Sequence, residues 1–292
     1  MKKFKQLFGR IKNLFGKIIY FEFLQKANIF LSRGVISAAL RDVNYTDPKT
    51  WEFSGLSQNG EDGIIDVLSR KIKNPNRYFV EIGCGNGIEN NTAFLALVKR
   101  WTGIMVEGDK KQISRMKRFW GPFAIVDCLN LFVSKDNISE IEKLATFKNP
   151  DVFSLDIDGN DYYVAMAFLE KFRPKIIAVE YNSSFGPDLS VAIDYRENIY
   201  EERERRELPV MYWGCSLEGW KKAFKERGYK FVTCDSNGIN AFFIDEKEFD
   251  EDFVKNLGEG FGYAMNISTR WSHGIDWRPQ YREMEHLPLL EV

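Results

Sequence analysis

Short apolar runs alternate with amphipathic stretches along the central part of this chain. The apolar runs fall at about residues 78–83, 103–107, 122–127, 151–157 and 175–181, and each has the length of one buried strand. The stretches around and between them have helical spacing, at about residues 61–73, 89–100, 108–120, 138–147 and 161–171. Strands that alternate with helices predict an α/β fold with a mainly parallel sheet and helices on both of its faces.

The pattern changes near the end of the sheet. Residues 217–227 predict a helix, residues 228–235 a strand and residues 239–244 a second strand. The turn between these strands, Ser236-Asn-Gly238, is too short for a crossover, so the two strands must be antiparallel. We therefore expect a Rossmann-like, mainly parallel sheet of seven strands that ends in an antiparallel hairpin.

A glycine-rich turn follows the first strand of this sheet. Gly83, Gly85 and Gly87 alternate there, and the next strand ends at Glu107. Glycine allows tight turns and lets a ligand approach the backbone, and a carboxylate can accept hydrogen bonds from both hydroxyls of a ribose. These features predict a site for an adenosine-containing cofactor. Ile88 stands where a dinucleotide fingerprint has its third glycine, which disfavours NAD.

Composition limits the class of protein. The chain has 292 residues, 44% of them hydrophobic, and a net charge of -1, so it can bury a core and shows no general bias toward nucleic acid. Its four cysteines lie far apart without a CxxC pair, which predicts free thiols in a reducing compartment. Neither a signal peptide nor a membrane-spanning run is apparent. We expect a cytoplasmic protein, with attachment to the inner face of the membrane as the alternative.

The alternative comes from residues 1–33, which carry eight basic residues and one acidic residue. Apolar residues recur among them at helical spacing: Phe4, Leu7, Phe8, Ile11, Leu14, Phe15, Ile18 and Ile19. Such a helix can lie on an anionic membrane surface. Its apolar face can equally pack on the catalytic domain or on a second copy of the chain, which would make a homo-oligomer. Both interpretations stay open.

Five segments carry a family resemblance, at residues 57–62, 79–87, 103–107, 155–161 and 179–182. In this order, over about residues 55–245, they resemble successive motifs of the FkbM-type methyltransferases. The resemblance implies a class I enzyme that uses S-adenosyl-L-methionine and methylates a hydroxyl of a small molecule or glycan. The corresponding division of the chain is a helical extension at 1–50, the catalytic domain at 51–250 and an aromatic tail at 251–292 that packs on it.

The resemblance and the strand positions together place the cofactor contacts. Those expected around the glycine turn and the second strand are Glu81, Gly83, Gly85, Asn86 and Glu107. Asp127, at the end of the third predicted strand, would accept from the adenine amino group, or else is a surface acid. Gln58 and Asp62 would reach the methionine end of the cofactor, or else only begin their helix.

Acidic side chains follow the next two strands. Asp156, Asp158 and Asp161 come after the fourth strand, while Glu180 and Asn182 end the fifth. Adjacent carboxyl ends of parallel strands are where ligands bind. Because oxygen ligands suit hard cations, one hypothesis makes Asp158, Glu180 and Asn182 ligands of Mg²⁺ or another divalent cation, with Asp156 nearer the cofactor. In the metal-free alternative, Asp158 or Glu180 takes the acceptor proton directly.

Two further regions bear on the site. His273 belongs to the aromatic tail and is either a base above the site or a structural residue. Residues 183–215 form an insertion after the fifth strand, which predicts a lid or acceptor-binding loop. Its charge run at 201–207 predicts a solvated helix face. Two other functional classes remain open: a non-catalytic membrane-associated scaffold and a dinucleotide-linked oxidoreductase.

Overall fold

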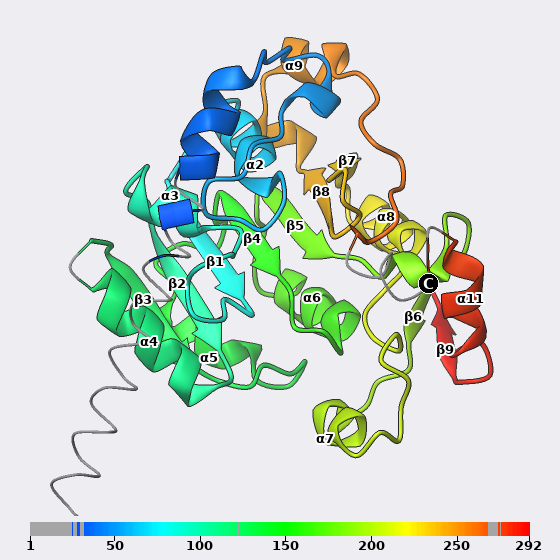
Figure 1. Ribbon diagram of the computed structural model, residues 1–292. Coiled ribbons are helices and arrows are strands. Elements are labelled where there is room, and N and C mark those ends of the chain that lie inside the picture. The colour runs from blue at the N-terminus through cyan, green and yellow to red at the C-terminus, as the bar shows by residue number, and fades with distance from the viewer. Residues whose placement is uncertain (1–24, 26–27, 30–31, 122, 268–273, 275) are drawn as a thin grey trace, which may run out of the picture.

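The computed structural model describes residues 25, 28–29, 32–121, 123–267, 274 and 276–292. Most of the basic N-terminal segment, and His273, lie outside the described residues. At the centre is a seven-stranded sheet in the order β3-β2-β1-β4-β5-β8-β7 (Figure 1). Its strands are β1 (Tyr78–Ile82), β2 (Thr102–Glu107), β3 (Val126–Asn130), β4 (Val152–Leu155), β5 (Ile176–Glu180), β7 (Lys230–Cys234) and β8 (Asn240–Ile244).

The pairing of the strands confirms the predicted fold class. Strands β1 to β5 pair in parallel, while β8 is antiparallel to both β5 and β7. The short turn before β8 forces that reversal. Because β1 to β5 are parallel, their carboxyl ends meet at one edge of the sheet, which holds the glycine turn and the acids.

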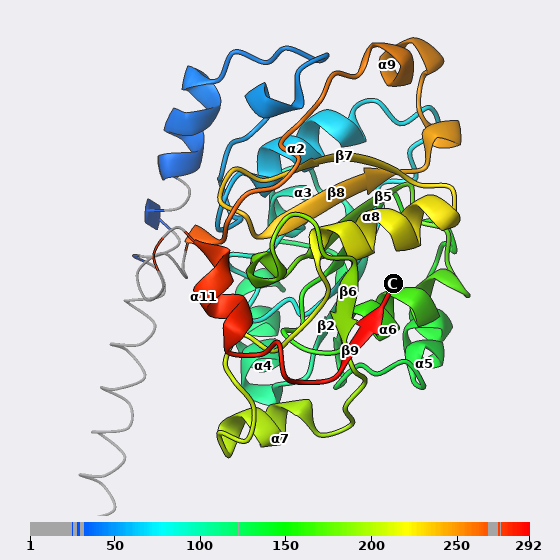
Figure 2. The same ribbon diagram turned by 90° about the vertical axis from the view of Figure 1, so that its right-hand side faces the viewer.

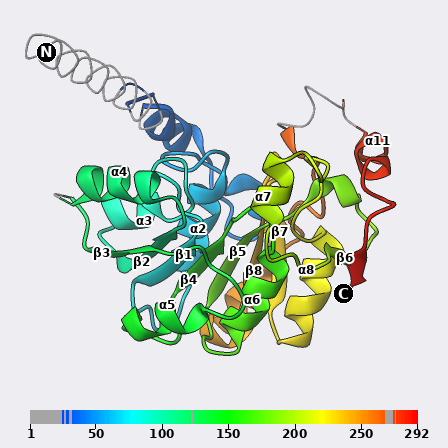
Figure 3. The same ribbon diagram turned by 90° about the horizontal axis from the view of Figure 1, so that it is seen from below.

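Helices cover both faces of the sheet, as Figure 3 shows edge-on. On one face lie α2 (Glu61–Ser69), α3 (Ala93–Leu97) and α4 (Lys110–Trp120); on the other lie α5 (Ile138–Leu144), α6 (Asp161–Leu169) and α8 (Leu217–Glu226). The alternation of a strand explains the two cores. Phe79 of β1 packs among the first set of helices and Val80 among the second. Among the described residues, every helix is too short or too polar to cross a bilayer.

The third strand lies later in the chain than the apolar pattern predicts. Phe123 and Ala124 still belong to the turn after α4, because their backbone nitrogens donate to the Trp120 carbonyl. Strand β3 begins at Val126, so Asp127 lies at its start, opposite Ile104 and not opposite Glu107. The place at the end of the strand that the adenine hypothesis gave to Asp127 is therefore wrong, because this exposed residue lies at the amino end of β3.

The insertion and the C-terminal tail fold together beside the sheet (Figure 2). Strand β6 (Val191–Ile193) of the insertion pairs antiparallel with β9 (Leu289–Glu291) of the tail. Helix α7 (Ile199–Glu204) and helix α11 (Trp277–Arg282) flank this pair, and a third apolar cluster fills the space between the segments. Remaining short elements are η1 (Pro48–Thr50), η2 (Ser183–Phe185), η3 (Glu246–Glu248) and α9 (Glu251–Asn256).

Candidate active site

Two of the glycines in the turn after β1, Gly83 and Gly85, have different roles. Gly83 has φ +89°, and an added Cβ would lie 1.6 Å from the Asp156 carbonyl oxygen at the end of β4. Glycine at this position therefore allows two strand ends to approach each other. Gly85 has φ +54°, and an added Cβ would meet nothing within 4 Å. The turn is thus open beside Gly85, which leaves space for a ligand next to the backbone.

Glu107 lies beside this open turn. One carboxylate oxygen accepts from the Gly85 backbone nitrogen at 2.8 Å, and the other accepts from the Asp109 nitrogen at 2.8 Å. The carboxylate is therefore fixed at the end of β2, and each oxygen keeps a lone pair for another donor. Asn86 acts locally, because its side-chain oxygen accepts from the Ile88 nitrogen at 2.9 Å.

Glu81 is buried and supports the loop that follows the glycines. Its carboxylate accepts from the Asn91 backbone nitrogen at 2.9 Å and from the Thr92 hydroxyl at 2.5 Å. Burial raises the pKa of Glu81 to about 7, although these hydrogen bonds favour the charged form. These hydrogen bonds join Glu81 to the loop at residues 91–92, so Glu81 fixes the position of the loop that follows the glycine turn.

Asp62 has a similar internal role at the start of α2. One of its oxygens accepts from three successive backbone nitrogens, those of Gly55, Leu56 and Ser57, at 2.6–3.0 Å. Burial raises its pKa to about 7. Gln58, in contrast, is exposed. The arrangement makes Asp62 the organiser of the segment that leads to Gln58.

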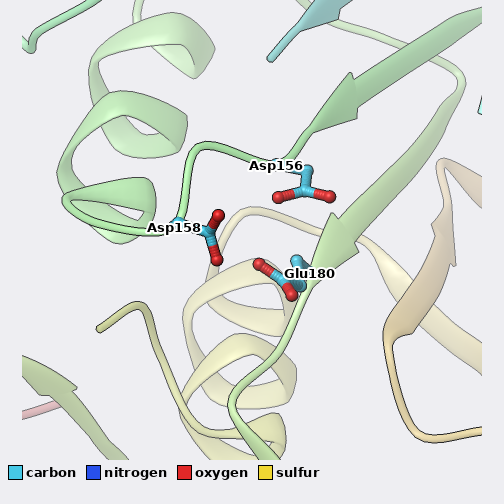
Figure 4. Close-up of side chains that lie close together, drawn as sticks. All are labelled: Asp156, Asp158 and Glu180. Carbon is cyan, nitrogen blue, oxygen red and sulfur yellow. The ribbon is translucent and has the colours of Figure 1, made fainter. Parts of the chain in front are cut away.

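Three carboxylates meet at the ends of β4 and β5 (Figure 4). Asp156 follows β4, Asp158 lies in the next loop, and Glu180 is the last residue of β5. Each offers an oxygen, and these oxygens all lie within 4.8 Å of one another. The second oxygen of Glu180, Oε2, is buried and has no hydrogen-bond partner in the structure. Such a set can take up a proton or a cation.

The electrostatics of this acid cluster favour proton uptake. Burial raises the pKa of Glu180 well above its usual range, and the charges of Asp156 and Asp158 raise it further. Burial and neighbouring carboxylates raise the pKa of Asp156 in the same way. Like charges this close cannot both ionise freely, so Asp156 and Glu180 retain a shared proton more readily than isolated acids.

Asn182 does not point its amide into this cluster. Its side-chain nitrogen donates to the carbonyls of Met211 and Trp213 at 2.7 and 2.9 Å, and its oxygen accepts from the Ser184 nitrogen at 3.0 Å. The residue is buried and ties β5 to the far end of the insertion. The amide of Asn182 is thus engaged by the insertion, while the carboxylates whose oxygens lie together are those of Asp156, Asp158 and Glu180.

The insertion holds the acid-bearing loop through α7. The Tyr200 hydroxyl donates to the Ile157 carbonyl at 2.5 Å, and the Arg203 guanidinium donates to the Asp158 carbonyl. Asp158 has φ +52°, a conformation that a residue with a side chain rarely adopts. Asp161 closes the loop from within, accepting from the nitrogens of Ile157 and Gly159 at 2.9 and 2.7 Å. Burial raises its pKa to about 6.

Sequence reasoning missed Arg203, because it belongs to the charge run at 201–207, which predicts a solvated helix face. The positive φ of Asp158 has no signal in the sequence. His273 lies outside the described residues, so its expected role as a base stays a prediction.

Comparison with known proteins identifies no family for this chain. No protein-family model matches this chain. No curated protein matches it either. Solved structures with a similar fold include the selenomethionine-substituted CurJ carbon methyltransferase, 14% identical, with a TM-score of 0.42 over 63% of this chain and 52% of that protein. This chain thus spans about half the length of the CurJ protein.

Two further solved structures resemble this chain to a similar degree. The O-methyltransferase from Bacillus cereus in complex with SAH is 14% identical, with a TM-score of 0.39 over 74% of this chain and 89% of that one. The precorrin-6y C5,15-methyltransferase from Geobacter metallireducens is 12% identical, with a TM-score of 0.37 over 64% and 90% of the two chains. These likenesses are too distant to assign a function to this chain.

Proposed function

We propose that this chain is an S-adenosylmethionine-dependent O-methyltransferase that acts on a hydroxyl of a sugar or sugar-containing metabolite. The proposal is carried by the juxtaposition of Gly85 and Glu107. The turn is open beside Gly85, and the carboxylate next to it has free lone pairs, so a ribose has both room and acceptors there. The resemblance of five sequence segments to FkbM-type enzymes supports a sugar hydroxyl as the acceptor.

The residues of the glycine turn would hold the methyl donor. The backbone of residues 83–86 would contact it, Glu107 would bind its ribose, and its methionine end would lie toward Asp156. When bound, S-adenosylmethionine supplies a sulfonium methyl group that is open to attack. The contribution of this chain is to hold an acceptor hydroxyl in line with that methyl group and to receive its proton.

The acid cluster would receive the proton. When the acceptor oxygen takes the methyl group, with the electrons of the carbon–sulfur bond left on sulfur, the hydroxyl proton would pass to Asp158 or Glu180. Burial and neighbouring charges raise the pKa of Glu180, so it is a stronger base in those molecules in which the shared proton lies on Asp156. Exposed Asp158 offers the approach from solvent.

The same carboxylates fit a divalent cation. Oxygens of Asp156, Asp158 and Glu180 lie within 4.8 Å of one another, and the buried Glu180 Oε2 has no hydrogen-bond partner among the residues that the structure describes. Mg²⁺ bound there would fix an acceptor hydroxyl and lower its pKa. The metal-assisted and metal-free versions differ in one measurable property, the dependence of turnover on a divalent cation.

The decisive measurement is calorimetric titration with S-adenosylhomocysteine, with and without Mg²⁺. We expect the wild-type protein to bind it and Glu107→Ala to bind about 100-fold more weakly, because two hydrogen bonds from ribose to a charged acceptor are lost. Asp127→Ala is the matched control. It removes an exposed carboxylate from the neighbouring strand, at its other end, and should leave affinity unchanged.

Other outcomes of this titration support the rival classes. Folded protein that binds no S-adenosylhomocysteine under either condition contradicts the proposal and favours a scaffold that keeps the fold without chemistry. Tight binding of NAD in its place would support an oxidoreductase, against the evidence of Ile88 and the antiparallel β8. Equal loss of affinity in Asp127→Ala would show that Glu107 acts only through net charge.

We extend the proposal to the insertion, whose helix α7 would position the acid loop beneath an acceptor. Arg203→Ala removes the donor to the Asp158 carbonyl, so we expect activity on an accepted substrate to fall about tenfold through loss of alignment. Arg205→Ala, beside α7 and paired only with surface acids among the described residues, should retain full activity. Identical losses in the two variants would contradict a positioning role for Arg203.

A further inference from the structure

The outer face of α4 is strongly basic. This helix carries Lys110, Lys111, Arg115, Lys117 and Arg118 and no acidic residue, and all five side chains are exposed. None of the five makes an ion pair with an acid in the part of the chain that the structure describes. In a chain of net charge -1, this is a concentrated positive surface. It is suited to an anionic partner.

Large apolar side chains are exposed beside the basic ones. Phe123 and Ile125, in the turn between α4 and β3, are 67% and 81% exposed. Ile113 and Met116 are buried on the side of α4 that packs against the sheet. The basic side chains of α4 and the apolar residues of the turn after it therefore face solvent. Exposed apolar groups next to a polar surface mark an interaction site.

The helix at residues 32–40 adds to the same side of the molecule. Figure 3 shows this helix, in blue, on the side of the sheet that carries α4. Val35, Ile36 and Leu40 on this helix are 70%, 60% and 81% exposed. It continues the segment 1–33, with its eight basic residues. A second part of the chain thus adds exposed apolar residues on this side of the molecule.

We propose that α4 and the turn after it dock on an anionic lipid bilayer. Lipid fits both features, since cations pair with anionic head groups while aromatic and aliphatic side chains enter the acyl boundary. Single-stranded nucleic acid would use the cations and could stack a base on Phe123, but the other exposed apolar side chains, Ile125, Val35 and Leu40, are aliphatic and offer no stacking platform. This surface is independent of the proposed methyl transfer.

The test is co-sedimentation of the full chain with phosphatidylcholine vesicles, with and without phosphatidylglycerol. The variant Lys111→Glu/Arg115→Glu/Arg118→Glu reverses three exposed charges one turn apart. Each basic residue near an anionic surface contributes about fivefold in partitioning, so we expect this variant to bind anionic vesicles at least about 100-fold more weakly. Ile125→Ser should weaken binding as well, without a change in thermal stability.

The matched control is Lys225→Glu/Lys247→Glu/Lys255→Glu, which has the same change in net charge at exposed positions on α8, η3 and α9. It should lose much less binding than the α4 variant. Three results would overturn the proposal: equal loss in both triple variants, binding to RNA in preference to anionic vesicles, or binding that is lost on removal of residues 1–33 yet unchanged in the α4 variant. The last result would place the membrane contact in the N-terminal segment alone.

Discussion

Gly83→Ala should lower the free energy of unfolding by about 4 kcal/mol, among the largest effects of any single substitution in this chain. The added Cβ would overlap the Asp156 carbonyl oxygen at 1.6 Å, and φ +89° disfavours any side chain. Relief requires β1 and β4 to separate at the edge that holds the acid cluster. Urea unfolding measures the loss, and titration with S-adenosylhomocysteine should show that binding is lost with it.

Gly85→Ala is the informative partner of this variant. Its Cβ meets nothing within 4 Å, so only the positive φ is penalised and we expect a loss of about 1 kcal/mol. The methyl group nevertheless enters the open space beside Glu107, so affinity for S-adenosylhomocysteine should fall while the protein stays folded. Gly262→Ala, which has neither a close neighbour nor a positive φ, should change neither property.

These three variants separate folding from binding. Wild-type stability in Gly83→Ala would contradict the close approach of the two strand ends. Wild-type affinity in Gly85→Ala would show that the space beside this residue does not receive the ligand, even if the ligand binds elsewhere. Either result is visible without an accepted substrate.

The sheet could be predicted from sequence because its central strands are buried on both faces. Such strands appear as uninterrupted apolar runs, and β1, β2, β4 and β5 lie close to their predicted positions. Strand β3 is one of the two edge strands of the sheet, and none of its residues is fully buried. The apolar residues Phe123 and Ile125 before it are exposed, so an apolar run there does not mark a strand. Because β3 begins at Val126 and not at residue 122, Asp127 lies at the start of this strand and not at its end.

The pairing of β6 with β9 could not be predicted from local pattern. Each strand has three residues, and almost a hundred residues of chain separate them, so neither periodicity nor a turn signal identifies the pair. The hydrogen bonds of the Asn182 side chain also depend on tertiary structure. Its amide is drawn to the carbonyls of Met211 and Trp213 by the course of the insertion, which its neighbours in sequence do not specify.

The acid cluster makes a second strong prediction: Glu180→Gln should stabilise the metal-free protein while removing activity. Burial and the charges of Asp156 and Asp158 raise the pKa of Glu180 well above its usual range, so its ionised form is disfavoured in the folded state. Glutamine is neutral at every pH and can donate a hydrogen bond to Asp156. We expect a gain of about 1–2 kcal/mol near neutral pH and a loss of about 100-fold or more in turnover.

The pH dependence of this gain has a definite sign. Below the unfolded-state pKa of about 4.3, Glu180 is protonated in both states and contributes no difference. As the pH rises above that value, the unfolded chain releases the proton while the folded state holds it, so wild-type stability falls. The advantage of Glu180→Gln over wild type should therefore grow from acidic to alkaline pH, in urea unfolding curves recorded with a chelator.

At a buried acid that pairs with a cation, replacing the carboxylate with an amide should destabilise the protein. Asp151 pairs with buried Lys175 at 2.7 Å, so Asp151→Asn would leave an unpaired ammonium group and should destabilise the protein by about 3–5 kcal/mol. The same chemical change is thus expected to have opposite signs at two buried positions. Destabilisation by Glu180→Gln, or a gain that shrinks as the pH rises, would mean that Glu180 is ionised and paired in the folded protein. The unpartnered Oε2 argues against such a pairing, because a carboxylate kept there for stability alone would have a donor.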